Sequence, residues 1–379
     1  MGQEGRTVIG APVSTGGRVR QRVRVFLHVV PPATGVRARL SRRRAFRTVL
    51  WFVAAVVVLN VGWLAALDYG PARLRDPEYG KRLTQVRART GENPTRPLVL
   101  TLGSSRTAMG VCPAVLEDGA SGPLLFNFSL AGSGPVMELM ALRRALADGV
   151  RPAAVVVEYW PAFLHEGGPY HEQARLDVAR LRLVDRALVR EFFRDPAAAE
   201  AAMRDQRLNP WYGHRRSLVN QIMPSLLLKS ERSESMWKGI DDWGWLPGRV
   251  SATAEERAKG VESTATYYVP LFASYEVSEV ADRALRQLVA ECRANGIAVA
   301  LMYLPEGATF RAYMTADSVR ASDAHLRRVV SELGVPLIDA RGWVPDDDLP
   351  DGFHLTQSGA AKFTRRLSGA VAETFPELR

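Results

Sequence analysis

The stretch that decides the fold is Leu98 to Thr107, which reads LVLTLGSSRT. Its first five residues, rich in Leu and Val, are typical of a buried strand, and Gly103 then allows a turn that places Ser104 and Ser105 at a helix start. A serine in this position lies at the rim of an α/β sheet, beside helical N–H groups that have no intrahelical partner. Taken alone, the stretch fits a helix-capping serine better than a nucleophile, so the distinction depends on residues further along the chain.

The same alternation of strand and helix continues along the chain. Nearly uninterrupted apolar runs predict further strands, which are PLLFNFS at 123–129, AAVVVEY at 153–159, IAVALMYL at 297–304 and VPLIDA at 335–340. Strands of this kind are buried on both faces of a parallel sheet that has helices on each side. The sequence therefore predicts a three-layer α/β/α sandwich with a mainly parallel, five-stranded, flavodoxin-like sheet.

A segment from about 165 to 269 interrupts this alternation. It carries no strong strand signal, so we expect a mainly helical insertion in a domain that spans residues 98–379. Within it, residues 175–193 are amphipathic and predict one helix. The three tryptophans of residues 237–245 are expected to pack the insertion onto the core, and stacking on sugar rings is the alternative.

The net charge of +10 is concentrated at the amino terminus. Residues 1–47 hold eleven arginines and a single acidic residue, Glu4, so the rest of the chain is neutral overall. An arginine-rich terminus without a basic folded domain does not predict nucleic-acid binding. We expect residues 1–47 to form a mostly disordered cytoplasmic tail.

An uncharged run of residues follows this basic tail. Residues 48–67 read TVLWFVAAVVVLNVGWLAAL and, as a helix, would span about 30 Å, the thickness of a bilayer core. The arginines on its amino-terminal side predict that the tail stays in the cytoplasm and that the rest of the chain crosses the membrane. We therefore expect a single-pass membrane protein, with a polar stalk at 68–97 and an extracytoplasmic domain in the periplasm or at the cell surface.

Cysteine and histidine spacing gives no metal signature. Cys112 and Cys292 are far apart, and each lies in or beside an expected helix, which favours two separate buried thiols over a disulfide. His165 and His171, each followed by a glutamate, are more typical of a solvated loop than of a metal site. No metal and no cofactor is expected.

The second informative motif is DGFH, at Asp351 to His354. It follows the last expected strand and precedes the last helix, so it falls at the same sheet edge as Ser105. A histidine there can accept the serine proton, and a carboxylate three residues earlier can hold the imidazole in the required tautomer. The alternative is a surface loop with an incidental histidine.

With these motifs, the chain resembles the SGNH/GDSL hydrolase superfamily over residues 98–159 and 273–379. GSS at 103–105 is similar to the family's GDS block, with serine in place of the usual aspartate. NFSLAGSG at 127–134 is similar to the second block, and DGFH is similar to the last. The resemblance implies a catalytic triad of Ser105, Asp351 and His354, and an oxyanion hole formed by the backbone N–H groups of Ser105 and Gly132.

One block of the family pattern is missing. GGND would follow the third strand, where this chain reads WPAFLH at 160–165, so the asparagine that completes the oxyanion hole in the family is absent. The loss of one such donor typically costs about 3 kcal/mol of transition-state stabilisation. Nearby substitutes, which are also the candidate substrate-binding residues, are Arg106, Tyr159 and Trp160. A structural pairing of Arg106 with Glu158 fits the sequence equally well.

The membrane anchor and the incomplete oxyanion motif together resemble members of the superfamily that act in cell-envelope acylation, such as alginate O-acetylation proteins and teichoic-acid D-alanylation accessory proteins. The resemblance implies a serine esterase or O-acyltransferase that acts on acyl esters of a cell-envelope glycan through a Ser105 acyl-enzyme. It also implies a membrane-bound O-acyltransferase as a candidate partner. Two alternatives remain open: a catalytically silent assembly or glycan-binding subunit that keeps the fold, and a lipase-like hydrolase of small esters.

Overall fold

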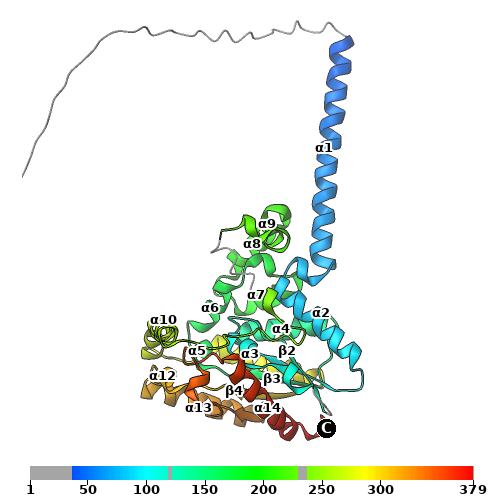
Figure 1. Cartoon of the computed structure of the whole chain (residues 1–379). Helices are drawn as coiled ribbons and strands as arrows, with labels where there is room; N and C mark the ends of the chain where they lie inside the picture. Colours follow the sequence, from blue (N-terminus) through cyan, green and yellow to red (C-terminus); the bar gives the residue numbers. More distant parts are fainter. Residues whose placement is uncertain (1–35, 118–121, 229–236, 379) are drawn as a thin grey trace, which may run out of the picture. The chain divides into compact units, whose positions relative to one another are not determined.

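A computed structural model describes residues 36–117, 122–228 and 237–378 of the chain. The chain divides into two compact units, Met1–Val56 and Val57–Arg379, and the second contains the sheet and every predicted site residue (Figure 1). Most of the expected cytoplasmic tail lies outside the described residues, but its last part is helical, because the first helix already begins at Val36.

The second unit is built on a sheet of five strands in which every neighbouring pair is parallel. The strand order is β2-β1-β3-β4-β5. The strands are β1 (Leu98–Leu102), β2 (Leu124–Asn127), β3 (Ala154–Glu158), β4 (Ala298–Tyr303) and β5 (Leu337–Asp339). The predicted five-stranded parallel sheet is confirmed, and each strand lies within the apolar run that predicted it.

Helices connect the strands and fill the insertion. They are α1 (Val36–Tyr69), α2 (Pro77–Glu92), α3 (Ser105–Gly110), α4 (Pro135–Ala147), α5 (Pro161–Leu164), α6 (Gly168–Arg175), α7 (Arg186–Phe192), α8 (Pro196–Leu208), α9 (Pro210–Ile222), α10 (Ala254–Ala273), α11 (Glu279–Ala294), α12 (Ala308–Arg311), α13 (Ala316–Leu333) and α14 (Gln357–Thr374).

Both faces of the sheet are buried, as the apolar strands predict. Along β1, Leu100 and Leu102 belong to one hydrophobic cluster, and Val99 belongs to another on the opposite face. This alternation follows from the two-residue period of a strand, which turns successive side chains to opposite faces.

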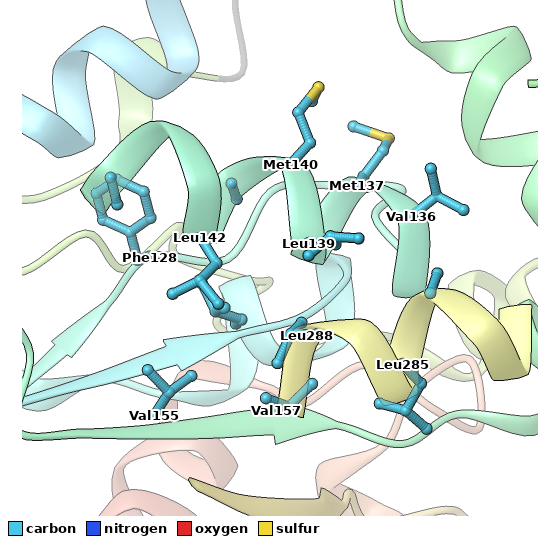
Figure 2. Close-up of a cluster of buried hydrophobic side chains, with 14 of the residues drawn as sticks. Phe128, Val136, Met137, Leu139, Met140, Leu142, Val155, Val157, Leu285 and Leu288 are labelled. Atoms are coloured by element: carbon cyan, nitrogen blue, oxygen red, sulfur yellow. The ribbon is translucent and has the colours of Figure 1, made fainter. Parts of the chain in front are cut away.

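Helices α4 and α11 cover the first face. Figure 2 shows them over β3, with Leu142 of α4 and Leu288 of α11 directed toward Val155 and Val157. On the other face lies α14, whose buried stripe consists of Ala360, Phe363, Leu367 and Val371. The sheet is therefore the middle layer of an α/β/α sandwich, and the loops at its carboxyl edge are held by packed elements on both sides.

Helix α1 has the length and composition of a membrane span. The stretch Ser41–Tyr69 is long and apolar enough to cross a bilayer, and none of its apolar window is buried within the protein. The helix contains the whole of the predicted span at 48–67. Its orientation, and the location of the domain that follows, stay predictions.

Residues 68–97 differ from the expected polar stalk, because they contain α2. The helix begins after Asp76, whose side chain accepts a hydrogen bond from the N–H of Tyr79. Tyr79, Leu83 and Val86 are buried in the same cluster as the sheet. Their spacing is helical, but the stripe is only three residues long and is surrounded by charged side chains, so the sequence pattern was too weak to reveal it.

The single amphipathic helix expected at 175–193 is also corrected. The structure ends α6 at Arg175 and begins α7 only at Arg186, with two short 3-10 turns between them. The side chain of Asp177 accepts a hydrogen bond from the Ala179 N–H and so starts a separate turn. Of the expected apolar face, Leu181, Leu188 and Phe192 are buried, but Val184 is 51% exposed. The apolar pattern therefore indicated burial at three of its four positions and did not indicate where the helix breaks.

Candidate active site

The side chains of Ser105, His354 and Asp351 form a hydrogen-bonded chain at the carboxyl edge of the sheet. The Oγ atom of Ser105 lies 2.8 Å from Nε2 of His354, and Nδ1 of His354 lies 2.7 Å from Oδ2 of Asp351. An ionised carboxylate only accepts hydrogen bonds, so Nδ1 carries the proton and Nε2 is free to accept from the serine hydroxyl. This arrangement has the tautomer that a general base for a serine nucleophile requires.

The local structure explains why Ser105 stands at this edge. Strand β1 ends at Leu102, and Ser104 then caps α3 by accepting a hydrogen bond from the N–H of Arg106. The capping role that the sequence allowed for a serine therefore belongs to Ser104. Ser105 is the first residue of α3, and its side chain turns to His354.

The Asp351 carboxylate is held by the loop it belongs to. Its Oδ1 atom accepts hydrogen bonds from the backbone N–H groups of Phe353 and His354, at 3.2 and 2.8 Å. Burial opposes ionisation of Asp351, but the hydrogen bonds and charge of His354, together with these backbone donors, hold the pKa of the carboxyl below its usual value. The carboxylate is thus ionised wherever the histidine has to work.

The two predicted oxyanion donors are backbone N–H groups that are free to bind a substrate. Within the described residues, neither the N–H of Ser105 nor that of Gly132 has a hydrogen-bond partner. The loop that carries Gly132 is joined to the nucleophile turn by the hydrogen bond from Leu130 N–H to the Gly103 carbonyl, at 3.0 Å. Gly132 has a φ of +81°, a conformation that favours glycine.

Arg106, a candidate substrate-binding residue, makes its contacts within the fold. Its side chain is buried between Glu158, 3.7 Å away, and Glu306, 3.4 Å away, and it donates to the backbone carbonyls of Leu304 and Pro305. Of the two alternatives that the sequence left open for Arg106, the structure supports the pairing with Glu158.

Tyr159 and Trp160, the other two candidate substrate-binding residues, are buried as well. The hydroxyl of Tyr159 donates to the Ser322 carbonyl and contacts His325. Trp160 stacks on Phe353, which in turn contacts the ring of His354. Trp160 therefore acts behind the histidine as a packing residue.

A cavity of about 670 Å³ adjoins the triad. Its lining includes Asp351 and Phe353 from the DGFH loop, Arg175 from the end of α6, and Tyr267 and Tyr268 from α10. The last three come from the insertion and were not predicted, because they carry no motif and their position depends on how the insertion folds. A smaller cavity of about 330 Å³ lies against His354 itself, beside Met109 and Leu355.

The cysteines and the tryptophans of residues 237–245 lie outside the hydrogen-bonded chain of Ser105, His354 and Asp351. Cys112 and Cys292 are both buried free thiols, as expected, and burial raises their pKa values to about 11 and about 12. Trp243 packs against the main core and Trp245 donates to the Met109 carbonyl, which supports the packing role over sugar stacking.

Glu172 is buried and accepts a hydrogen bond from the N–H of Met137, and burial raises its pKa to about 8. Among the described residues, no group of three or more His, Cys, Asp or Glu side chains is placed to hold a metal ion.

Comparisons with known proteins give similarity in fold at low scores. No protein-family model matches the chain, and no curated protein sequence matches it significantly. A proposed acylhydrolase from Bacteroides fragilis is 12% identical, with 78% of this chain and 97% of that one covered and a TM-score of 0.35. TesA is 13% identical, with 74% of this chain and 99% of that one covered and a TM-score of 0.33. A GDSL-like lipase from Bacteroides thetaiotaomicron is 10% identical, with 77% of this chain and 98% of that one covered and a TM-score of 0.34. An activity cannot be transferred at these values, so the function has to be argued from the site.

We predict that activity falls on acidification through protonation of His354. A general base must be neutral, and unperturbed histidine titrates near about 6.5. The lowered pKa of Asp351 keeps its carboxylate ionised in this range, so protonation of Asp351 causes no second decrease in activity. The measurement is kcat/KM for nitrophenyl acetate between about pH 5 and 8. A single ionisation is expected, and a flat profile would exclude histidine as the base.

Proposed function

We propose that this protein is a membrane-anchored, extracytoplasmic serine esterase or O-acyltransferase that acts on acyl esters of a cell-envelope glycan. The observation that carries the proposal is the chain of hydrogen bonds from Ser105 through His354 to Asp351. The three family-like motifs, each following a strand of the parallel sheet, support membership of the SGNH/GDSL superfamily.

The geometry supports a two-step acyl transfer. Ser105 Oγ attacks the ester carbonyl carbon while its proton passes to Nε2 of His354, and the tetrahedral oxyanion meets the free N–H groups of Ser105 and Gly132. The intermediate collapses, the C–O bond to the alcohol breaks, and the alkoxide takes the proton from His354. An acceptor hydroxyl or water then attacks the acyl-serine, gives its proton to His354, and releases Ser105 with its proton restored.

The location is inferred from α1 and from the charge of the chain. The uncharged run at 48–67, within the stretch Ser41–Tyr69, follows an arginine-rich tail, which favours a cytoplasmic amino terminus and a domain on the other side of the membrane. A cell-envelope glycan is the acyl acceptor or donor that such a position offers. A membrane-bound O-acyltransferase is the partner that we propose would supply acyl groups on that side.

The main competing function is a silent assembly or glycan-binding subunit. The missing third-block asparagine favours it, since one oxyanion donor is lost. The tautomer-setting contact of His354 with Asp351 and the unpaired N–H groups of Ser105 and Gly132 favour catalysis instead. A lipase-like hydrolase of small esters would use the same triad and differs only in its acceptor, water.

The first prediction from this proposal concerns the nucleophile. A fluorophosphonate probe should label the full-length wild-type protein and should fail to label Ser105→Ala. His354→Ala should lower the labelling rate strongly, because the serine hydroxyl is a poor nucleophile without its base. Ser104→Ala is the matched control: it removes only the helix cap, worth about 1 kcal/mol, and should keep the label. Labelling that persists in Ser105→Ala would rule out the proposed nucleophile.

The second prediction separates transfer from hydrolysis. Residues of α10 line the cavity that reaches Asp351. We therefore expect an acyl group on Ser105 to be partly covered from this side and to favour an acceptor that displaces water. We expect slow hydrolysis of nitrophenyl acetate and faster turnover when an oligosaccharide is added, with acetylated sugar detected by mass spectrometry. Rapid release of free acetate that no sugar changes would instead support the esterase alternatives.

A further inference from the structure

Arg175, the last residue of α6, lies directly over Gly132. A Cβ atom built on Gly132 would be 2.7 Å from Cδ of Arg175 and 3.2 Å from its Nη1 atom. The guanidinium group is thus packed against the residue whose free N–H is a predicted oxyanion donor. The contact also requires a glycine at 132, because a side chain there would displace the arginine.

The charge of Arg175 is not used elsewhere in the fold. Its side chain is exposed and lines the cavity that also contains Asp351 and Phe353. In the described part of the chain no carboxylate forms an ion pair with it, and no acceptor hydrogen-bonds to it. Arg106, by contrast, is buried between two glutamates, and the other two cations of the cavity, Arg249 and Lys259, are paired with Glu256 and Glu255. Arg175 is therefore a cation that remains available to a ligand.

We propose that the guanidinium of Arg175 binds the oxyanion of the tetrahedral intermediate and replaces the donor that the missing third-block asparagine would supply. The proposal rests on the acyl-transfer function proposed above. A guanidinium group offers several N–H donors and a full positive charge. Its interaction with the carbonyl oxygen therefore becomes stronger as negative charge develops there. It comes from the insertion rather than from the third strand, which explains why the loop after β3 can dispense with the asparagine.

The test compares Arg175→Ala, Arg175→Gln and wild type with nitrophenyl acetate. Loss of an oxyanion donor should lower kcat on the order of 100-fold and leave KM nearly unchanged. Guanidinium ion added to Arg175→Ala should restore part of kcat, which a merely structural role would not allow. Arg190→Ala is the control, since Arg190 is an exposed arginine of the same insertion that pairs with Glu200.

The possible results separate this proposal from the function on which it rests. If wild type fails to react with a fluorophosphonate, the acyl-transfer function is wrong. If wild type reacts and the Arg175 variants keep their kcat, or change only KM, the oxyanion role of Arg175 is wrong while the function stands. If the loss in Arg175→Ala is not rescued by guanidinium and Arg175→Gln retains wild-type kcat, the role is likewise excluded.

A second inference arises from exposed apolar side chains on α9 and the 3-10 turn that follows it. Leu208, Tyr212, Ile222 and Leu226 are between 62% and 82% exposed. They lie just before, along and just after a single helix. Large apolar side chains that gather on the surface often mark a contact with a partner or a membrane.

The position of α9 identifies the occupant. Trp211 stacks on Trp63 of α1, with ring centroids 4.8 Å apart, and both residues belong to the unit 57–379. Asp68, near the end of α1, binds Arg75 and Arg207, the latter from α8. Trp63 lies four residues before the end of the predicted span at 48–67, which is about 6 Å along the helix, so a ring stacked on it is near the membrane interface when α1 spans the bilayer.

We infer that α9 and the following turn rest in the interfacial layer of the same membrane that α1 crosses. The bilayer is favoured as occupant because the patch is continuous with the proposed span through the tryptophan pair. Arg215 lies over the ring of Tyr212, which places a cation beside apolar side chains as interfacial helices do. The contact would fix the distance of the active site from the bilayer.

The test uses full-length protein in liposomes of phosphatidylcholine with a minority of phosphatidylglycerol. Ile222→Cys and Leu226→Cys carry the environment-sensitive dye NBD, and Glu255→Cys on α10 is the exposed control. Nitroxide-labelled lipids should quench the dye at 222 and 226 but not at 255. If the dye at 222 and 226 is not quenched while the protein resists carbonate extraction, the membrane contact of α9 is wrong and the anchor stands. If the dye emission instead changes with protein concentration, the apolar side chains of α9 contact a second copy of the chain. Protein that carbonate extracts would overturn the anchor itself.

Discussion

The buried carboxylate of Glu158 holds the nucleophile turn in place. At the end of β3 it accepts hydrogen bonds from the Ser104 N–H at 2.6 Å and from the Thr107 hydroxyl at 2.7 Å. These contacts fix both sides of Ser105 against the neighbouring strand. Gly103 is needed for them, since a Cβ there would lie 2.5 Å from Glu158 Oε2. Removing one partner of such a buried, charged arrangement typically costs about 3–5 kcal/mol, so the site depends on it.

Arg106 extends this arrangement to a third strand. Its guanidinium lies between Glu158 and Glu306, and its donation to the Leu304 and Pro305 carbonyls ties the end of β4 to the start of α3. It also packs over the ring of Trp160, with its Cζ atom 4.8 Å from the ring centroid. Because Trp160 supports Phe353 and Phe353 contacts His354, the nucleophile and its base are positioned by one continuous cluster.

The sequence predicted the sheet and the triad for the same physical reason. Strands such as AAVVVEY are apolar on both faces, which a parallel sheet requires, and a parallel sheet gathers all strand-to-helix loops at one edge. Ser105 and His354 could therefore be placed together although 249 residues separate them. The burial of Arg106, Tyr159 and Trp160 could not be predicted. Each is next to a motif or a strand end in the sequence, and that position fits a side chain packed behind the active site as well as one that is exposed within it.

The insertion was the least predictable part of the chain and contributes much of what surrounds the triad. Its expected apolar stripe at 181, 184, 188 and 192 indicated burial, which holds for all but Val184. Aspartates divided the expected helix into short turns, and the break begins where α6 ends at Arg175. The same insertion supplies Tyr267 and Tyr268 to the cavity and Trp211 to the pair with Trp63. The proposed oxyanion contact of Arg175 and the proposed membrane contact of α9 thus both depend on a segment without motifs.

The central claim is that Ser105 forms an acyl-enzyme, and rapid-quench kinetics with nitrophenyl acetate test it most directly. The account predicts a burst of about one nitrophenolate per chain, followed by slower turnover, with the acetyl group on the peptide that contains Ser105 in the quenched protein. A folded protein that gives no burst and no acetylated peptide, or one acetylated at a different residue, would contradict it.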